Sequence, residues 1–496
     1  MTKLVEQLIQ PEILTLLRQH SGNREIWLVG GALRDHFLGR PQPDLDFVVD
    51  REAAGLARLL SEDLRAGYYS LDDERDAARV ILPDQAGTLD FVRRSGASIE
   101  TDLRERDFTI NALALPLEGD ERLIDPLGGL QDLKDRRLRP CSEDAVLRDP
   151  VRALRAVRLA VQFGLHMEPE TVLQVRAAGE RLSASPAERV RGEFMKLLDP
   201  SAAGTAIRLM DHLGLLIAVC PELDQLPGSE GAGRARSLTT LERLAELLEQ
   251  LGLRGNIGRA RNLAMAEVAL QLGRFRTGLS DHFQRRIRGG RLAVQLLGFA
   301  ALYSRGEGAP QATGSGAAAG AAALAERRGL KLRLSRPEAG RIRAIVLNHW
   351  RPAELAYSGA VGDGEVYRFF RATGEAGIEV VLLYLAASLS SLGSAPPPGE
   401  WKSRIGIART LFEAWFDRGD QVVRPRKLIA GDELAGALGL QAGSVIGELL
   451  EAIREAQAEG RVHDRESAIQ LARVLLESGR ARPRVERASK LRDKSL

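Results

Sequence analysis

The chain of 496 residues has only two cysteines, few aromatic residues and no long apolar run. Cys141 and Cys220 provide neither a disulfide framework nor the paired spacing of a structural metal site. No apolar run approaches the length needed to span a bilayer, and the N-terminal segment is too polar for a secretory signal peptide. We therefore expect a cytoplasmic protein with no membrane partner.

The net charge is small and unevenly distributed. The whole chain carries +3, but residues 479–496 contain seven Lys or Arg and only two acidic residues, which leaves the other 478 residues at −2. An RNA-binding site in the near-neutral part must therefore be a local patch, and the basic end is expected to be disordered. Aromatic residues make up only 5% of the chain, and Ala, Leu and Arg are abundant, which favours helices.

The N-terminal quarter predicts an α/β unit, in which short strands alternate with helices up to about Pro140. One amphipathic helix is expected at Leu4–His20, with a break or a second start at Pro11. Strands are expected at Ile26–Val29 and Leu45–Val49, followed by a helix at Glu52–Asp63. A hairpin of two strands is expected at Arg79–Leu82 and Thr88–Val92.

The stretch Ile26–Val49 carries the first indication of chemistry. Gly30 and Gly31 follow a predicted strand and precede a short helix. Glycines let a backbone approach a ligand closely, and the helix start presents free N–H groups to an anion. This arrangement suits a triphosphate.

Asp44 and Asp46 lie two positions apart on the second predicted strand, so their side chains point to the same face. Two carboxylates held this close are costly unless a cation lies between them, and Mg²⁺ prefers such oxygen ligands. Asp90 lies in a neighbouring predicted strand and is either a third carboxylate of this site or a solvated strand residue.

Two further segments mix charged and apolar residues. In Asp102–Leu115, the side chains of Arg106, Asp107 and Asn111 suit a ribose and a phosphate, but a structural ion pair of Arg106 with Asp107 or Asp102 is an equal alternative. In the helix predicted from Arg148 to Pro169, charged residues recur at every third position between apolar ones, namely Asp149, Arg152, Arg155 and Arg158.

Because that helix is apolar around much of its circumference, its charges are expected to face a cleft, where Asp and Arg can bind base edges and further Arg can bind phosphates. The alternative is a helix covered by surface charges. In the next helix, within Ser185–Leu198, Glu188, Arg189 and Glu193 are interpreted as braces between neighbouring helices.

The remainder is predicted to be helical. Gly306–Ala323 and Gly393–Gly399 are interpreted as loops, and His349 as a packed residue because no other His or Asp is spaced to share a metal with it. Lys427–Leu476 has an alternating loop-and-helix pattern, with Gly439 and Gly443 on either side of a turn.

The chain resembles the bacterial class II tRNA nucleotidyltransferase and poly(A) polymerase family, a branch of the polymerase-beta-like nucleotidyltransferases. The resemblance covers residues 24 to about 225, with a weaker match at Ala442–Gly447 and Glu455–Gly460. It is carried by six ordered motifs, LVGGALRD (Leu28–Asp35), DLDF (Asp44–Phe47), RDFTINALA (Arg106–Ala114), IDPLGGLQDL (Ile124–Leu133), DPVRALRAVRLA (Asp149–Ala160) and SPAERVRGEFMKLL (Ser185–Leu198).

The resemblance implies an α+β fold, with a polymerase-beta-like nucleotidyltransferase head of mixed sheet and helices followed by an all-α neck, body and tail. The implied regions are an N-terminal helix (1–23), the catalytic head (24–140), a neck with the base-reading helix (141–226), a body with a degenerate HD-like region (227–420), a tRNA-binding tail (421–478) and a basic disordered extension (479–496).

The resemblance also implies a role for each matching residue. Asp44 and Asp46 would bind two Mg²⁺ ions as catalytic carboxylates, and Asp90 is grouped with them. Nucleotide-binding roles fall on Gly31 and Arg34 at the triphosphate, Arg106 at the nucleotide, Asp149 and Arg152 at the base edge, and Arg155 and Arg158 at the triphosphate or as supports of the helix.

The implied function is template-independent addition of nucleotides from CTP and ATP to the 3′ end of tRNA, by a two-metal mechanism that releases pyrophosphate. Three departures from the family pattern stand out. Arg148 replaces an acidic residue before Asp149, the segment between Phe91 and Asp102 is short, and Ala293–Ser304 is apolar where relatives carry a His–Asp metal pair.

Full CCA-adding members have a longer flexible segment after the position of Phe91, so its shortness favours addition of CC. An A-adding enzyme or a poly(A) polymerase remains the alternative, and a catalytically inactive RNA-binding protein is the alternative from a different class. No phosphatase or phosphodiesterase activity is expected of the body.

Overall fold

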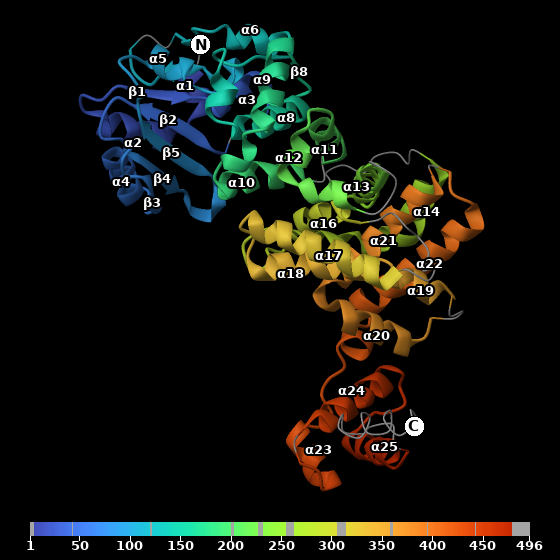
Figure 1. Cartoon of the computed structure of the whole chain (residues 1–496). Coiled ribbons are helices and arrows are strands. Elements are labelled where there is room, and N and C mark those ends of the chain that lie inside the picture. Colours follow the sequence, from blue (N-terminus) through green and yellow to red (C-terminus); the bar gives the residue numbers. More distant parts are fainter. Residues whose placement is uncertain are drawn as a thin grey trace. The chain divides into compact units, whose positions relative to one another are not determined.

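The computed structural model describes residues 4–41, 43–119, 122–199, 203–226, 232–253, 262–304, 314–357, 361–393, 395–441 and 443–478. The chain forms two compact units. The first comprises Met1–Phe194 and Leu209–Val219, and the second comprises Met195–Arg208 and Cys220–Leu496. The first contains the sheet, and the second is built from helices (Figure 1).

The first unit is organised around a six-stranded mixed sheet with the strand order β3-β4-β5-β2-β1-β6. Only β2 and β5 are parallel neighbours, and the other neighbouring pairs are antiparallel. The strands are β1 (Ile26–Val29), β2 (Leu45–Val49), β3 (Gly67–Asp72), β4 (Ala77–Ile81), β5 (Thr88–Arg93) and β6 (Ala114–Pro116).

Apolar side chains cover both faces of the central strands. On one face, Trp27, Val29 and Val48 form a core with residues of helix α5 (Ile99–Arg104). On the other face, the rings of Phe47 and Phe91 stack with their centroids 5.0 Å apart. All four residues of β1 are buried, and the second residue is the one exposed position of β2. That residue is a carboxylate in a strand whose other residues are buried.

The strands β1 and β2 and the hairpin of β4 and β5 confirm the predictions from sequence. Strand β3 was not predicted, because it lies at the sheet edge and lacks an alternating buried pattern. The helical segment expected at residues 4–20 forms α1 (Leu4–Leu8) and α2 (Pro11–Ser21), which confirms the predicted interruption at Pro11. Proline at the first position of a helix has no N–H to leave unpaired, which explains the second start.

Two helices of the first unit lie between strands of the sheet in the chain, α3 (Gly31–Phe37) between β1 and β2 and α4 (Ala53–Asp63) between β2 and β3. The helices after β6 include α7 (Ala145–Arg148), α8 (Val151–Phe163), α9 (Pro169–Gly179) and α10 (Ala187–Leu197). The prediction of one helix from Arg148 to Pro169 is wrong at both ends. Asp149 has an extended backbone because it precedes Pro150, and the left-handed Gly164 ends α8. The predicted burial of this helix is confirmed, since eight of its residues are buried.

The second unit consists mainly of helices packed around α21 (Gly377–Leu392), in which residues 377–389 are all buried. By length and composition alone, the segment Asp363–Leu392 is long and apolar enough to cross a membrane, but 78% of that window is buried inside the protein. It is therefore a core helix of this unit. The helices before α21 are α13 (Ala232–Gln250), α14 (Leu263–Leu272), α15 (Arg276–Gln284), α16 (Ala293–Leu302), α17 (Gly314–Lys331), α18 (Arg336–Asn348), α19 (Arg351–Tyr357) and α20 (Asp363–Thr373).

The loop predicted at Gly306–Ala323 is wrong where the structure describes it. Residues 306–313 lie outside the described residues, but residue 314 begins α17. Alanine is the strongest helix former, and Ala318, Ala321 and Ala322 are buried in this helix, so tertiary packing overrides the glycines. The loop predicted at Gly393–Gly399 is confirmed in the main, since α22 (Pro398–Phe416) begins only at its end.

The C-terminal part of the second unit has a small core of its own, formed around Leu434, Ile446, Leu449 and Ile453. It comprises α23 (Gly431–Leu438), α24 (Ser444–Ala458) and α25 (Arg465–Glu477). Gly439 ends α23 with a φ of +68°, as expected for the predicted turn. Residues 479–496, predicted to be disordered, lie outside the described residues.

The helical state of residues 314–331 leads to a stability prediction. Proline in place of Ala322 removes a backbone N–H and clashes with the preceding turn of a buried helix, which costs roughly 3 kcal/mol. Ala322→Pro should therefore clearly lower the thermal unfolding midpoint measured by circular dichroism. Ala395→Pro, in the connection before α22, is the matched control and should change the midpoint little. Equal midpoints for the two variants would contradict a packed α17.

Candidate active site

Three carboxylates gather on one face of the parallel strand pair. Strands β2 and β5 pair so that Asp46 lies directly opposite Asp90. Asp44 precedes β2 by one residue, two positions before Asp46 and on the same face. Its Oδ1 atom accepts hydrogen bonds from the backbone N (3.0 Å) and Oγ1 (2.9 Å) of Thr88, which fix Asp44 at the start of β5.

Asp46 is exposed as a residue, but protein atoms surround its carboxylate. Desolvation by this surrounding protein and repulsion from Asp90 and Asp44 raise the pKa of Asp46, while Arg106 and Arg155 oppose that rise. Such an unfavourable carboxylate group fits a divalent cation, which would relieve the repulsion. Among the described residues, no group of three or more His, Cys, Asp or Glu is placed to hold a metal, so a cation at Asp44 and Asp46 needs further ligands from substrate or water.

Asp90 is held by an arginine that the sequence interpretation did not identify. Arg79 on β4 donates to both carboxylate oxygens of Asp90, at 2.7 and 2.6 Å. This contact with Asp90 raises the pKa of Arg79, and the negative charges of Asp44 and Asp46 add to the rise. Asp90 thus lies beside Asp46 with its own charge compensated. This contact could have been predicted from the sequence. In the predicted hairpin of residues 79–82 and 88–92, Arg79 lies opposite Asp90, as the structure shows.

The glycine turn brings the backbone against this carboxylate group. Gly30 has a φ of +73°, and a Cβ atom there would lie 3.1 Å from Nη1 of Arg106 and 3.7 Å from Oδ2 of Asp46. The missing side chain therefore leaves room between a guanidinium and a carboxylate. Gly31 follows at the first position of α3, and its Cβ position would lie 3.5 Å from Nη2 of Arg34.

Arg34 and Arg106 are each held by an aspartate. Arg34 is buried, donates to both carboxylate oxygens of Asp35 at 2.8 Å, and donates to Oδ1 of Asn111 at 2.6 Å. Arg106 pairs with Asp102 at 3.2 Å, so the structural ion pair left open by the sequence is present. Its pairing does not remove it from the site, because its guanidinium still lies beside Gly30.

Asp107 anchors the helix α8 to the head. It is buried and accepts hydrogen bonds from the backbone N of Phe108 (2.8 Å) and from Nδ2 of Asn111 (3.1 Å), and Nε of Arg155 lies 2.6 Å from it. Although burial raises the pKa of Asp107, the positive charge of Arg155 and these hydrogen bonds hold it below its usual value. Arg155 is thereby positioned so that its charge also reaches Asp46.

Asp149 and Arg152 lie at the start of α8. Arg189 of α10 donates to Asp149 at 2.6 Å, and Nε of Arg152 lies 3.7 Å from the same carboxylate. Arg152 also donates to the backbone oxygens of residues 105, 106 and 145 at 3.0 to 3.1 Å. The pair is therefore connected to the backbone of Arg106 beside the carboxylate group.

Arg158 lies three residues beyond Arg155 on α8, and its side chain contacts another helix. Its Nε donates to Glu193 of α10 at 2.8 Å, and Nη1 donates to Gln162 at 3.2 Å. These contacts support the helix, as one of the two expected roles requires. Glu193, through Arg158, and Arg189, through Asp149, thus brace neighbouring helices, as predicted. His349 in the second unit is buried against the backbone oxygen of Val346 at 2.7 Å, which confirms that it is packed.

Two family models match successive parts of the chain. Residues 26–139 match the model described as Poly A polymerase head domain, and residues 164–226 match the one described as Probable RNA and SrmB- binding site of polymerase A. Both matches fall almost entirely within residues 24 to about 225, where the six motifs carry the family resemblance.

Curated relatives match over most of their length. The chain is 30% identical over 458 residues to a CC-adding tRNA nucleotidyltransferase of Geobacter sulfurreducens, covering 92% of this chain and 93% of the relative. It is 33% identical over 451 residues to an A-adding tRNA nucleotidyltransferase of Deinococcus radiodurans, covering 88% and 92%.

Solved structures show the same fold. A CCA-adding enzyme of Thermotoga maritima complexed with tRNA matches with a TM-score of 0.60 at 21% identity, covering 96% of this chain and all of that chain. A CCA-adding enzyme with ATP matches with a TM-score of 0.64 at 21% identity and the same coverage. The predicted α+β fold with a mixed-sheet head and helical remainder is confirmed.

The raised pKa of Asp46 leads to a prediction about stability. Ionised Asp46 disfavours the folded state at any pH above its folded pKa, and this cost disappears as the pH falls from that value towards the ordinary pKa of an aspartate. Asp46→Asn should therefore raise the thermal unfolding midpoint at neutral pH in metal-free buffer, and the gain should shrink on acidification. Asp84→Asn, at an exposed residue of the same unit, is the control and should show neither effect.

Proposed function

The chain belongs to the class II tRNA nucleotidyltransferase and poly(A) polymerase family, and we propose that within it this protein adds CMP residues from CTP to the 3′ end of tRNA. It is a template-independent nucleotidyltransferase, and it acts on tRNA with CTP and ATP as candidate nucleotides. The head supplies the carboxylates and arginines that this chemistry requires. We place the protein in the cytoplasm.

The observation that carries the choice of CC is the short connection after β5. Strand β5 ends at Arg93 and α5 begins at Ile99, so only residues 94–98 separate them. Family members that complete CCA carry a longer flexible segment here, which serves the switch from C to A. With a connection this short, we infer addition that stops before the final A.

A addition is the second candidate. The A-adding relative of Deinococcus radiodurans is 33% identical to this chain, compared with 30% for the CC-adding relative of Geobacter sulfurreducens. Overall similarity therefore does not separate the two activities, and the nucleotide choice depends on the geometry around Asp149 and Arg152.

Nucleotidyltransferases of this family use a divalent metal, and we propose that Asp44 and Asp46 hold Mg²⁺. When bound, Mg²⁺ would lower the pKa of the RNA 3′-hydroxyl and neutralise charge on the triphosphate. The 3′-oxygen forms a bond to the α-phosphorus, the bond from that phosphorus to the β-phosphate bridge breaks, and pyrophosphate leaves while the hydroxyl proton passes to solvent. Catalysis is positioning plus electrostatics, without a covalent enzyme intermediate.

The chain's own residues position the nucleotide. We propose that Gly31, Arg34 and Arg106 lie along the triphosphate, where the turn at Gly30 leaves room. Asp149 and Arg152 present an acceptor and donors to the base edge, in place of a template strand. We assign Arg155 and Arg158 to holding α8 against the head and α10, because aspartate and glutamate partners bind both guanidiniums.

The first functional prediction concerns nucleotide choice. Purified protein incubated with Mg²⁺ and a tRNA that ends at the discriminator base should incorporate two CMP residues from CTP and then stop, as resolved by denaturing gel electrophoresis. ATP-only incorporation on tRNA ending in CC would instead show A addition, and long ATP-dependent tails on unrelated RNA would show poly(A) synthesis. No incorporation with any nucleotide would contradict the enzyme assignment.

The second functional prediction separates base selection from metal binding. Arg152→Ala should reduce discrimination between CTP and ATP by about 10- to 100-fold, since one well-placed base contact is worth roughly 1–3 kcal/mol. The measurement is kcat/KM for each nucleotide. Asp44→Ala should abolish transfer of both nucleotides, whereas Arg158→Ala, on the same helix, should leave discrimination unchanged. Intact discrimination in Arg152→Ala would remove this residue from base selection.

A further inference from the structure

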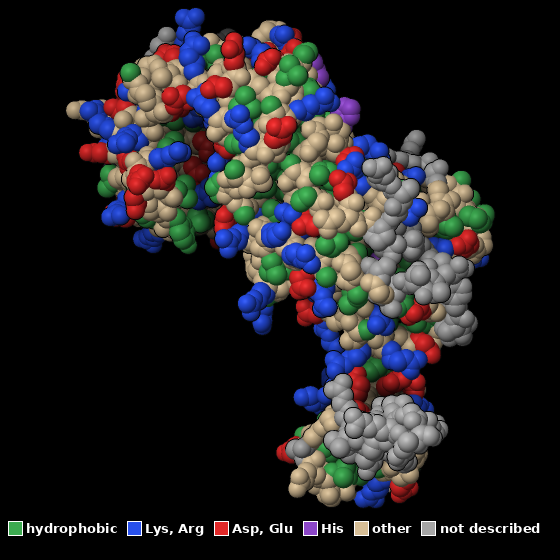
Figure 2. Space-filling view, in the orientation of Figure 1, with side chains coloured by type: hydrophobic (Ala, Val, Ile, Leu, Met, Phe, Trp, Pro, Cys, Tyr) green, Lys and Arg blue, Asp and Glu red, His purple; other side chains and the backbone are tan. Residues whose placement is uncertain are grey.

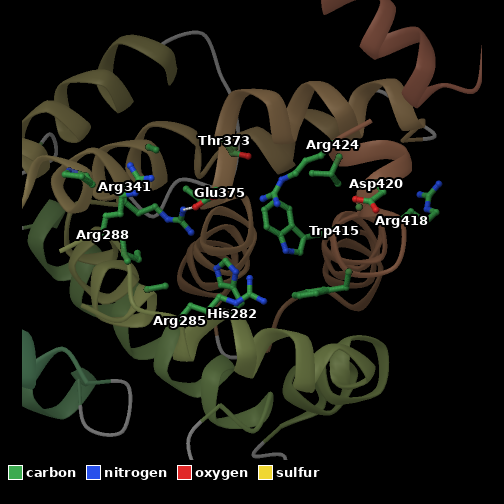
Figure 3. A pocket seen from close by; sticks show the side chains of 18 of the residues that line it. His282, Arg285, Arg288, Arg341, Thr373, Glu375, Trp415, Arg418, Asp420 and Arg424 are labelled. Atoms are coloured by element: carbon green, nitrogen blue, oxygen red, sulfur yellow. Dashed lines mark ion pairs between the residues drawn. The ribbon is translucent and has the colours of Figure 1, made fainter. Parts of the chain in front are cut away.

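A cavity of about 1050 Å³ lies within the second unit. The carboxylate site lies in the first unit, so the two sites share no residue. Its walls come from the turn after α15, from α18, from the junction of α20 and α21, and from the end of α22 with the following π-helix η7 (Gly419–Val423). Figure 3 shows side chains from these elements around the cavity, with Arg341, Glu375, His282, Trp415 and Arg424 nearer its middle and Arg418 and Asp420 at one side. Single π-helical turns of this kind occur often at functional sites.

Arginines dominate the charged lining of this cavity. Acidic residues in the lining are Glu375, Asp417 and Asp420, half as many as the arginines. On the face seen in Figure 2, by contrast, blue and red side chains are interspersed. The cavity is therefore a local concentration of positive charge in a near-neutral protein. The arginines are Arg285, Arg286, Arg288, Arg341, Arg418 and Arg424.

Two of these arginines are neutralised within the protein. Arg341 donates to Glu379 at 2.6 Å, and Glu375 lies 3.7 Å from it. Arg418 donates to both carboxylate oxygens of Asp363 at 2.9 Å. Arg341 and Arg418 therefore hold the wall of the cavity together. The remaining positive charge of the lining comes from the other four arginines.

The remaining arginines lack acidic partners among the described residues. Arg285 and Arg288 are exposed and have no side-chain partner there, and Arg286 donates only to the backbone oxygen of Gly290 at 2.7 Å. Arg424 lies over the ring of Trp415, with its guanidinium carbon 4.7 Å from the ring centroid. Cations that face one cavity repel one another, so an anion that enters gains from all of them.

Charged and aromatic side chains that are held by hydrogen bonds and ring contacts form the floor of the cavity. His282 lies 3.2 Å from the fully buried Glu379, which also binds Arg341. Although burial raises the pKa of Glu379, its hydrogen bond with His282 and the charge of Arg341 hold it below its usual value. Trp415 is packed against Phe370 at 5.1 Å, so both the indole and the buried carboxylate are fixed before any ligand arrives.

We propose that this cavity binds a free nucleoside triphosphate, separately from the nucleotide that reacts at the carboxylate site. Guanidinium groups match phosphate oxygens in geometry and charge. The volume lies at the upper end of small-molecule sites, and Ile287, Pro337 and Ala344 provide apolar wall for a base and ribose. Duplex RNA, recognised over successive grooves, does not fit inside a cavity of this size.

The test counts ATP molecules bound per chain by equilibrium dialysis of the full-length protein without RNA. The double variant Arg285→Ala, Arg288→Ala should bind one ATP fewer than the wild type, or bind it at least about tenfold more weakly, because two charge-assisted contacts are lost. Its nucleotide transfer to tRNA should be unchanged. The double variant Arg327→Ala, Arg473→Ala removes two exposed arginines outside the cavity and should keep the wild-type count.

Inorganic triphosphate in place of ATP distinguishes recognition of the phosphates from recognition of the whole nucleotide, since weaker binding shows that the base and ribose contribute. A change in tryptophan emission on ligand addition that is lost in Trp415→Phe places the ligand in this cavity.

Equal ATP counts in all three proteins would overturn the proposal. So would unchanged ATP binding with weakened tRNA binding in the cavity variant, because the arginines would then serve RNA. The count does not depend on transfer activity, so failure of the proposed function leaves it interpretable.

Discussion

The repulsion between carboxylates on the parallel pair β2 and β5 is the constraint on which the first unit depends. The register that places Asp46 beside Asp90 follows from burying Phe47 against Phe91 on the opposite face, so the hydrophobic core holds the acidic residues together. Arginines from three separate segments offset the cost. Arg79 comes from the neighbouring strand, Arg106 from the turn after α5 and Arg155 from α8.

These arginines connect the proposed metal site to the residues proposed for base selection. Arg155 is fixed by the buried Asp107, and Arg152, one turn earlier, donates to the backbone around Arg106. Helix α8 is thus attached to the head at both positions. A displacement of α8 would remove positive charge from Asp46 and move Asp149 at the same time. The proposed metal binding and the proposed base selection would therefore depend on the same contact between α8 and the head.

The sequence allowed the prediction of whatever depends on local spacing. Adjacent residues were enough to predict that Asp44 and Asp46 share one face of a strand. They were also enough to predict the glycine turn and the hairpin. Partners distant in sequence were not, since nothing near Arg158 indicates that Glu193 neutralises it. The segment containing Ala318 and Ala322 was misjudged because small residues were taken as a sign of flexibility, whereas packing of alanine faces against α18 makes a helix.

The two units apply the same electrostatic principle with opposite sign. In the first, carboxylates that repel one another form the site that we propose for a divalent cation and the triphosphate. In the second, the arginines of one cavity are held together by a framework in which Glu379 and Asp363 neutralise only part of their charge. Folding energy from the helical core maintains this residual charge, as the stacked phenylalanines maintain the acidic group in the head. Arginines that face one cavity without acidic partners among the described residues, beside a fixed floor, are the groups that an anionic ligand requires.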